Sequence, residues 1–250
     1  MALVQVLLLT IVCVFPAVVL SQLRILGGYD ASRSRYPFVA IIAHSRTVVG
    51  NGAILAPKWV VTSGSALYMP SETEYCAVIG GDSLSTSNNW HEAERVWKHP
   101  DWIGWHNNVG LLQLKKPIVY GPTVKPIKLA STNPDRLLAE VVSYGQNDRG
   151  TSQLQMGLFL LSSDSECINS LKEYLSRDII RIGHGYCVSP TNDRKYVLWW
   201  NDAGAPAIAD DLLYGVFAIG DYYDDAPTDY VATRLGSQDL RDWIYSKVNA

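Results

Sequence analysis

Charged residues are scarce in this chain of 250 residues, and their signs nearly cancel. Aspartate and glutamate number 24 and lysine and arginine 21, which leaves a formal net charge of −3. A chain with this balance has no basic surface broad enough to hold a nucleic acid backbone, so we exclude nucleic acid as a partner. Repeats and low-complexity segments are also absent, and apolar residues make up 48% of the chain, which indicates one large or two small globular domains.

Cysteine is rare, with only four residues. Cys13 lies in a segment that we expect to be removed, and this leaves an odd number of cysteines. The simplest arrangement is one disulfide between Cys167 and Cys187, which enclose a segment with a helical pattern, and a buried free thiol at Cys76. Histidine and cysteine form no cluster with the spacing of zinc ligands, so we predict neither a metal nor a cofactor.

Long apolar runs are absent except at the N-terminus, where the first twenty residues carry no charge. This run predicts a signal peptide over residues 1–21, and hence a secreted chain without a membrane segment in its mature form. The alternative is a signal anchor, because the run is nearly long enough to span a bilayer. Pro16 and the small residues near its end favour cleavage.

The remainder reads as short apolar or alternating runs, broken by turn residues at short intervals. Helical patterns occur only after Ser165 and at the C-terminus, over residues 237–250. This pattern predicts an all-β barrel or sandwich protein with one terminal helix, and residues 129–138 suit a connection between two halves. The predicted strands are 37–43, 47–55, 58–63, 75–81, 109–114, 139–145, 154–161, 212–220 and 229–235.

Seven short motifs occur in an order that resembles the trypsin-like serine proteases. They are "RILGGYDA", "KWVVTSGSA", "VWKHPDW", "NNVGLLQLKKPI", "VKPIKLA", "NDAGAP" and "DYVATRL". The resemblance implies two packed antiparallel six-stranded β-barrels, over about 25–135 and 136–236, and a C-terminal α-helix over 237–249. It also implies a short propeptide, residues 22–24, that is removed by cleavage after Arg24.

The catalytic positions of that family are all replaced in this sequence. The chemistry needs a hydroxyl nucleophile, an imidazole base and a carboxylate that orients the base. The matching positions hold Ala203, Ser65 and Asn108, none of which can take its role. Asn201 stands where a glycine amide helps to stabilise the oxyanion, so the oxyanion hole is also impaired. We therefore expect no catalytic residues and a pseudoprotease.

The specificity pocket is expected to be occluded. Resemblance places Val197 at its base, Tyr230 at a position that glycine normally keeps open, and Trp199 at a lost disulfide cysteine. Gly50 and Ala66 replace both members of another family disulfide. No small-molecule substrate is expected.

The activation switch is retained. Cleavage after Arg24 gives Ile25 a free amine, and Asp202 occupies the position of the carboxylate that pairs with that amine. A buried pair of this kind survives only with good geometry, so the resemblance predicts an Ile25–Asp202 activation pair.

Trp102, Ile103 and Trp105 lie in a loop that overhangs the cleft in the family, and they are the candidate partner-binding residues. The alternative is that the tryptophans pack down into the inactive cleft. Loss of the whole triad resembles the inactivated serine protease paralogues of the scabies mite, relatives of mite trypsin-like allergens. That likeness implies a protein secreted into the mite gut lumen and faeces, which binds host complement components and inhibits them as immune evasion.

Two other classes of function stay open. One is an unconventional or residual serine hydrolase, which needs an accessible cleft and a displaced nucleophile and base. The other is a non-catalytic cofactor or decoy that binds a protease of a cascade, or its inhibitor.

Overall fold

The computed structural model describes most of the chain after the predicted propeptide. The described residues are 25, 28–81, 89–146, 152–191, 198, 200–218, 222–223, 226–227 and 230–249. The predicted signal peptide and propeptide, and the pocket residues Val197 and Trp199, lie outside these residues.

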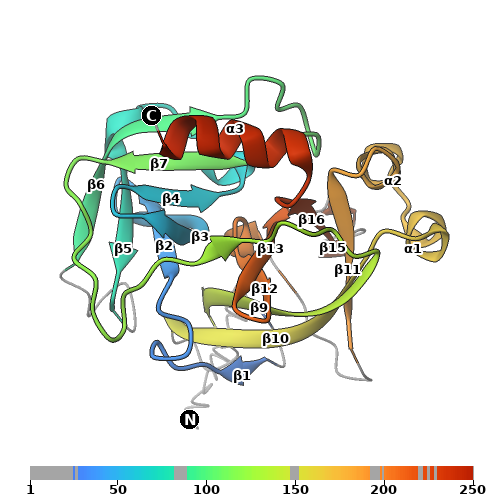
Figure 1. Cartoon of the computed structure of the whole chain (residues 1–250), viewed down its shortest axis with the longest axis horizontal. Coiled ribbons are helices and arrows are strands. Elements are labelled where there is room, and N and C mark those ends of the chain that lie inside the picture. Colours follow the sequence, from blue (N-terminus) through green and yellow to red (C-terminus); the bar gives the residue numbers. More distant parts are fainter. Residues whose placement is uncertain are drawn as a thin grey trace, which may run out of the picture.

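Six strands of the N-terminal half close into a barrel, with neighbours in the order β2-β3-β4-β7-β6-β5 (Figure 1). All residues of β2 are buried because its two faces meet different cores. Ala40 and Ile42 face the barrel interior, whereas Val39 and Ile41 pack in a cluster shared with the other half of the molecule. The strands are β2 (Val39–His44), β3 (Thr47–Ala56), β4 (Trp59–Thr62), β5 (Tyr75–Ile79), β6 (Trp90–Lys98) and β7 (Gly110–Leu114).

A second barrel follows, with neighbours in the order β9-β10-β11-β16-β13-β12, and it closes because β12 pairs with β9. The two closed antiparallel barrels confirm the predicted fold. The ring strands are β9 (Arg136–Gln146), β10 (Ser152–Ser162), β11 (Gly185–Pro190), β12 (Pro206–Ala209), β13 (Leu212–Ala218) and β16 (Val231–Arg234). Short strands are added outside the ring: β1 (Tyr29–Asp30), β8 (Lys128–Leu129), β14 (Tyr222–Tyr223) and β15 (Ala226–Pro227).

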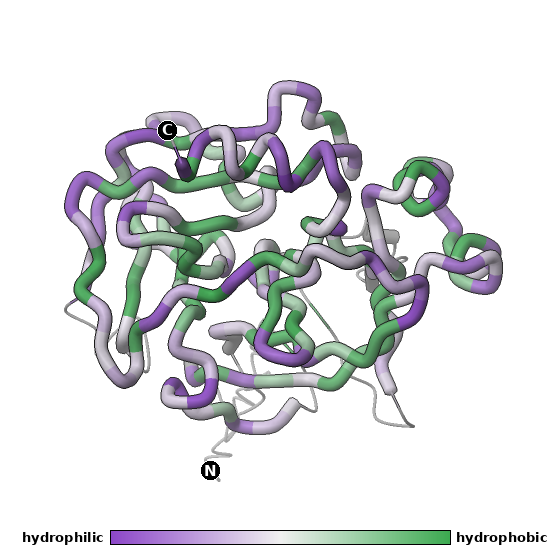
Figure 2. The backbone as a smooth tube through the Cα atoms, in the orientation of Figure 1, coloured by the Kyte–Doolittle hydropathy of each residue, from purple (hydrophilic) through white to green (hydrophobic). Residues whose placement is uncertain are grey.

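The helices lie where the sequence predicts them. The C-terminal helix α3 (Gln238–Val248) lies beside β7 of the first barrel (Figure 1), and its chain alternates between hydrophobic and hydrophilic residues (Figure 2). Leu240 and Ile244, one turn apart, are its buried anchors. None of the helices in the described ranges has the length and apolarity needed to cross a bilayer. The other helices are α1 (Ser165–Ser170) and α2 (Tyr174–Arg181), and the 3₁₀ turns are η1 (Gly64–Leu67), η2 (Glu72–Glu74) and η3 (Trp200–Asp202).

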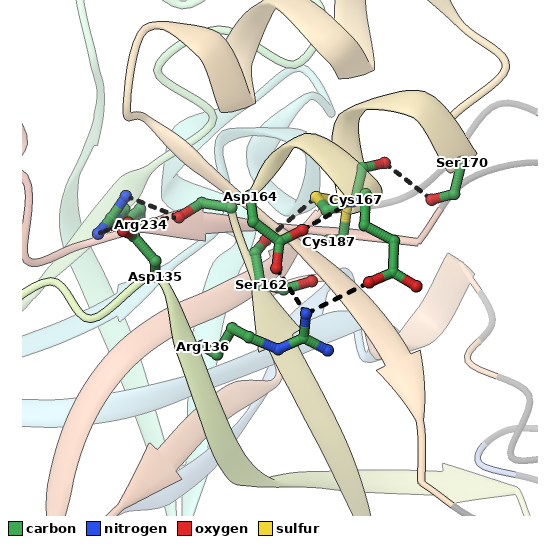
Figure 3. Close-up of a disulfide and its surroundings, with 10 residues drawn as sticks. Asp135, Arg136, Ser162, Asp164, Cys167, Ser170, Cys187 and Arg234 are labelled. Atoms are coloured by element: carbon green, nitrogen blue, oxygen red, sulfur yellow. Dashed lines mark hydrogen bonds and ion pairs between the residues drawn. A yellow bond between two sulfur atoms is a disulfide. The ribbon is translucent and has the colours of Figure 1, made fainter.

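The predicted disulfide joins Cys167 of α1 to Cys187 of β11, with 5.9 Å between the Cα atoms (Figure 3). Asp164 caps α1 by accepting the amide hydrogen of Cys167, and it also pairs with Arg136 of β9 at 2.7 Å. The cap, the ion pair and the disulfide together fix α1 to the second barrel. Cys76 is free and buried, as predicted.

The chain crosses between the barrels over residues 127–130. The amide of Ile127 donates to Ile54 of the first barrel at 2.9 Å, and the amide of Ala130 donates to Leu213 of the second at 2.9 Å. The crossing therefore starts two residues before the segment that the sequence suggested, and it ends well before β9 begins. A cluster of buried residues from both barrels and from α3 fills the junction.

Two neighbouring residues of β5 should make the protein sensitive to alkali. Burial raises the pKa of Tyr75 from 10.0 to about 12 and that of Cys76 from 9.0 to about 11. Because the unfolded chain releases these protons at lower pH than the folded chain, the stability that they contribute is complete below about pH 9 and is lost as the pH rises toward 12. Urea unfolding followed by fluorescence should show this decline. In Cys76→Ala the decline between about pH 9 and 11 should be smaller, and a profile identical to that of the parent chain would contradict the assignment.

Candidate functional site

Ser65 and Asn108 are hydrogen-bonded to each other at the junction of the barrels. Ser65 lies in η1, directly after β4, and Asn108 lies just before β7. Asn108 Oδ1 accepts from the Ser65 amide at 2.8 Å, and Asn108 Nδ2 donates to Ser65 Oγ at 3.3 Å. Ser65 Oγ then donates to Ser63 Oγ at 3.0 Å. The two positions have come together as the sequence predicts, but the network is neutral and contains no imidazole or carboxylate.

Ala203 lies in a tight turn beside Gly50 of β3. Its side chain is 1% exposed, and the turn continues through Gly204 with a φ of +76°. A Cβ at Gly204 would lie 2.1 Å from Thr62 Oγ1 and 2.2 Å from the carbonyl oxygen of Asn51, so only glycine fits there. The turn therefore requires glycine after Ala203 and keeps the Ala203 methyl group buried.

Asn51 of β3 holds this turn in place by hydrogen bonds, a role that the sequence did not predict. Its backbone amide donates to the carbonyl of Ala203 at 2.7 Å, and its side-chain Nδ2 donates to the carbonyl of Asn201 at 2.8 Å. Its Oδ1 accepts from the amide of Tyr144 in β9 at 2.8 Å. The side chain is fully buried, so it joins three segments that lie far apart in the sequence. A lone asparagine between two glycines carried no signal of this role.

Gly50 and Ala66, the two positions of the lost disulfide, are adjacent in space. A Cβ built on Gly50 would lie 2.9 Å from Cβ of Ala66 and 2.6 Å from the carbonyl oxygen of Ala203. Glycine at position 50 therefore lets the Ala203 turn approach β3 closely, at the place where Asn51 binds it.

Asp202 is completely buried beside the same turn and accepts a hydrogen bond from Ser143 Oγ at 2.5 Å. Ile25 is also buried, in the core cluster of the second barrel that contains Leu198 and Ala205. The Ile25–Asp202 activation pair stays a prediction, because Ile25 has an amine only after the chain is cut at Arg24.

Tyr230 is half-buried against the core of the second barrel, and its ring lies 6.1 Å from that of Phe217. Burial raises the pKa of its phenol to about 12, and the negative charge of Asp202 acts in the same direction. Since Val197 and Trp199 lie outside the described residues, the occlusion of the pocket stays a prediction.

Comparison with known proteins identifies the family. The family model described as Trypsin matches residues 25–244. The chain belongs to the trypsin family.

Two relatives are similar to this chain in sequence, one of them over nearly its whole length. Hypodermin-B of Hypoderma lineatum is 29% identical over 261 residues, which cover 96% of this chain and 95% of that protein. Complement C1s of Rattus norvegicus is 28% identical over 154 residues, which cover 54% of this chain and only 22% of C1s. In fold, the chain is similar to neuropsin, a serine protease expressed in the limbic system of mouse brain. That comparison has a TM-score of 0.72 and 17% identity over 89% of this chain and 99% of neuropsin.

The loop before Asn108 carries the three candidate partner-binding residues, which differ in exposure. The prediction for one of them has to be corrected. Trp105 is only 9% exposed and packs against Cys167, Cys187 and neighbouring residues of α2, so it supports the fold and is not available to a partner. Trp102 is half-buried and packs over Gly64, where a built Cβ would lie 3.0 Å from its ring. Ile103 is 74% exposed.

Helix α2 extends the apolar surface around Ile103. Tyr174 and Leu175, both exposed, lie at its start, and Leu175 lies against Gly104 of the loop. His106 of the loop and Asp178 of α2 hold the two segments together, with 3.3 Å between Nε2 and Oδ2. We call Trp102, Ile103, Tyr174 and Leu175 the Ile103 patch.

A cleft of about 380 Å³ lies next to Ser65. Ser65 and Asn201 lie at its wall, and the remainder is mostly apolar. Among the residues that the structure describes, no group of three or more His, Cys, Asp or Glu side chains is arranged to hold a metal ion. The other residues that line the cleft are His44, Ser45, Thr47, Val48, Val49, Tyr68 and Met69.

Replacing Asn51 with alanine should destabilise the protein strongly. It would remove the hydrogen bonds that the Asn51 side chain makes with the carbonyl of Asn201 and the buried amide of Tyr144, at a cost on the order of 2–5 kcal/mol. Asn169→Ala, at an exposed position of α1, is the matched control and should change the free energy of unfolding by less than about 0.5 kcal/mol. Urea unfolding of the two variants tests this. Equal stability of both would show that Asn51 does not hold the turn.

Proposed function

We propose that this chain is a secreted, catalytically inactive member of the trypsin family, which acts by protein–protein contact and inhibits host complement. The observation that carries the proposal is the neutral contact of Ser65 with Asn108, together with a buried methyl group at Ala203. Acyl transfer by this family's mechanism requires a nucleophile and a base at these places. Without them, an oxyanion hole and binding alone retain roughly 10³–10⁴-fold acceleration over water.

A rebuilt triad is the rival proposal, and the histidines argue against it. His44, His106 and His184 each lie within 4 Å of a carboxylate oxygen, which is half of what a triad needs. The other half is a nucleophile within hydrogen-bond reach of the imidazole. In the described part of the chain, the hydrogen bonds of the histidines go to backbone or carboxylate groups and none goes to a hydroxyl or thiol. A residual hydrolase is therefore the weaker candidate.

The Ile103 patch is the contact surface that we favour. Monomeric proteins seldom expose neighbouring large apolar side chains without a use for them, and aromatic residues contribute most at protein interfaces. Tyr174 is 64% exposed and Ile103 74%, and both are carried by segments that the His106–Asp178 contact holds in place. A surface that is already ordered loses little entropy on binding.

The choice of complement as the target rests on two likenesses. The chain is similar to 22% of complement C1s over about half of its own length, and its triple substitution resembles the inactivated mite paralogues. A chain with the outer surface of such a protease and no nucleophile can occupy the contacts of the enzyme without cleaving anything. The predicted signal peptide over residues 1–21 supports secretion. A decoy for another protease cascade is the alternative partner class.

Purified protein added to human serum should reduce the deposition of complement proteins on an activating surface. The variant Ile103→Asp with Tyr174→Ala should inhibit roughly tenfold less, because it removes two exposed apolar contacts without touching the core. The control is Val119→Asp with Tyr120→Ala, an exposed apolar pair elsewhere, which should inhibit normally. Unchanged deposition with saturating parent protein would refute the complement proposal. Full inhibition by the Ile103 variant would show that the contact surface lies on another face of the protein.

A further inference from the structure

A second cavity lies where α3 packs on the first barrel, and none of its lining residues lines the cleft. Its volume is about 270 Å³, close to the lower limit of ligand pockets. Two indole rings, two cationic side chains and two polar side chains line it. The lining residues are Trp59 of β4, Arg95 and Trp97 of β6, Gln113 of β7, and Ser246 and Lys247 of α3.

Two cations are held on one indole at this cavity. The guanidinium carbon of Arg95 lies 5.0 Å from the centre of the Trp97 ring, and Nζ of Lys247 lies 4.7 Å from it. Within the described residues neither cation is within 4 Å of a carboxylate, and the nearby Lys58 and Glu94 pair with each other. Contact with an aromatic face orients a cation without neutralising it, so both positive charges remain available to a ligand.

Of the other polar groups of the cavity, Gln113 leaves a donor available, whereas the hydroxyl hydrogen of Ser246 is already used. Gln113 uses its carbonyl oxygen to accept from Trp97 Nε1 at 3.4 Å, which leaves its NH₂ group to donate. Ser246 Oγ donates to the backbone of Trp243 at 2.7 Å. Guanidinium, ammonium and amide groups thus line one small cavity, and the matching ligand is rich in acceptors and negatively charged.

We propose that this cavity binds a sulfated saccharide unit of a glycan chain. The sulfate groups of such a unit accept the charge-assisted hydrogen bonds that arginine and lysine supply, and its oxygen atoms accept from the NH₂ group of Gln113. Two cations suit one or two sulfates and are too few for a nucleic acid, which needs many phosphate contacts. A ligand at α3 leaves the cleft and the Ile103 patch free, so the site can tether the protein to a sulfated surface. The proposal does not depend on the proposed function.

Calorimetric titration at physiological ionic strength tests the site, with a size-defined heparin oligosaccharide and the same oligosaccharide after removal of its sulfates. The parent protein should bind only the sulfated form. Arg95→Ala with Lys247→Ala should weaken binding by about a hundredfold, at about tenfold for each lost charge-assisted contact. Lys128→Ala with Arg181→Ala removes the same two charges from exposed positions outside the cavity and should leave the affinity within about threefold.

The results separate a built site from general attraction between charges. Equal weakening in the two double variants, or no binding of the sulfated form by the parent, would overturn the proposal. So would equal binding of the two oligosaccharides. Trp97→Leu gives a further check, because it removes the surface that orients both cations and should weaken binding while the net charge is unchanged. Thermal unfolding should show that the charge variants are as stable as the parent, since Arg95 is exposed and Lys247 lies in the last turn of α3.

Discussion

The arrangement of the candidate site depends on the hydrogen bonds of one buried residue, Asn51. Its side chain and backbone bind Ala203, Asn201 and Tyr144, and its carbonyl oxygen accepts from Thr62 Oγ1 at 2.6 Å. Every hydrogen-bonding group of the residue except one amide hydrogen thus has a partner, as a fully buried polar residue requires. In this way β3 of the first barrel, β9 of the second and the Ala203 turn are held in one geometry without the disulfide that the Gly50 and Ala66 positions lack. The close approach of the turn to β3 in turn requires glycine at position 50.

Neutrality distinguishes the Ser65–Asn108 contact from a catalytic pair. A buried carboxylate beside an imidazole has to be stabilised against the loss of its hydration, whereas an amide and a hydroxyl satisfy each other without that cost. The one carboxylate that is kept nearby, Asp202, is completely buried and is held by Ser143. A carboxylate is thus buried beside the Ala203 turn, whereas the network of Ser65, Asn108 and Ser63 contains none.

The strand and helix patterns of the sequence predicted an all-β protein with a terminal helix, and the family resemblance supplied the two barrels. The sequence missed the barrel strands β6, β11 and β12. In β6, charged Glu92, Glu94 and Arg95 interrupt the apolar residues and a bulge shifts the alternation. The sequence also missed Asn51, whose role exists only when positions 51, 144 and 201 meet in space. Loop sequence could not tell that Trp105 turns into the core while Ile103 stays outside, since that depends on the disulfide-linked cluster beneath. For the same reason the contribution of Tyr174 and Leu175 to the Ile103 patch was invisible before α2 was located.

The central claim is that this trypsin-family chain has no nucleophile that a base can activate. A fluorophosphonate reacts covalently with an activated serine and needs no specificity pocket suited to any one peptide. The direct measurement is the intact mass of the protein, cut so that it begins at Ile25, after incubation with such a probe and beside active trypsin as the positive control. The account predicts that trypsin gains one probe and this chain gains none. A stoichiometric mass increase at any serine of this chain would contradict it.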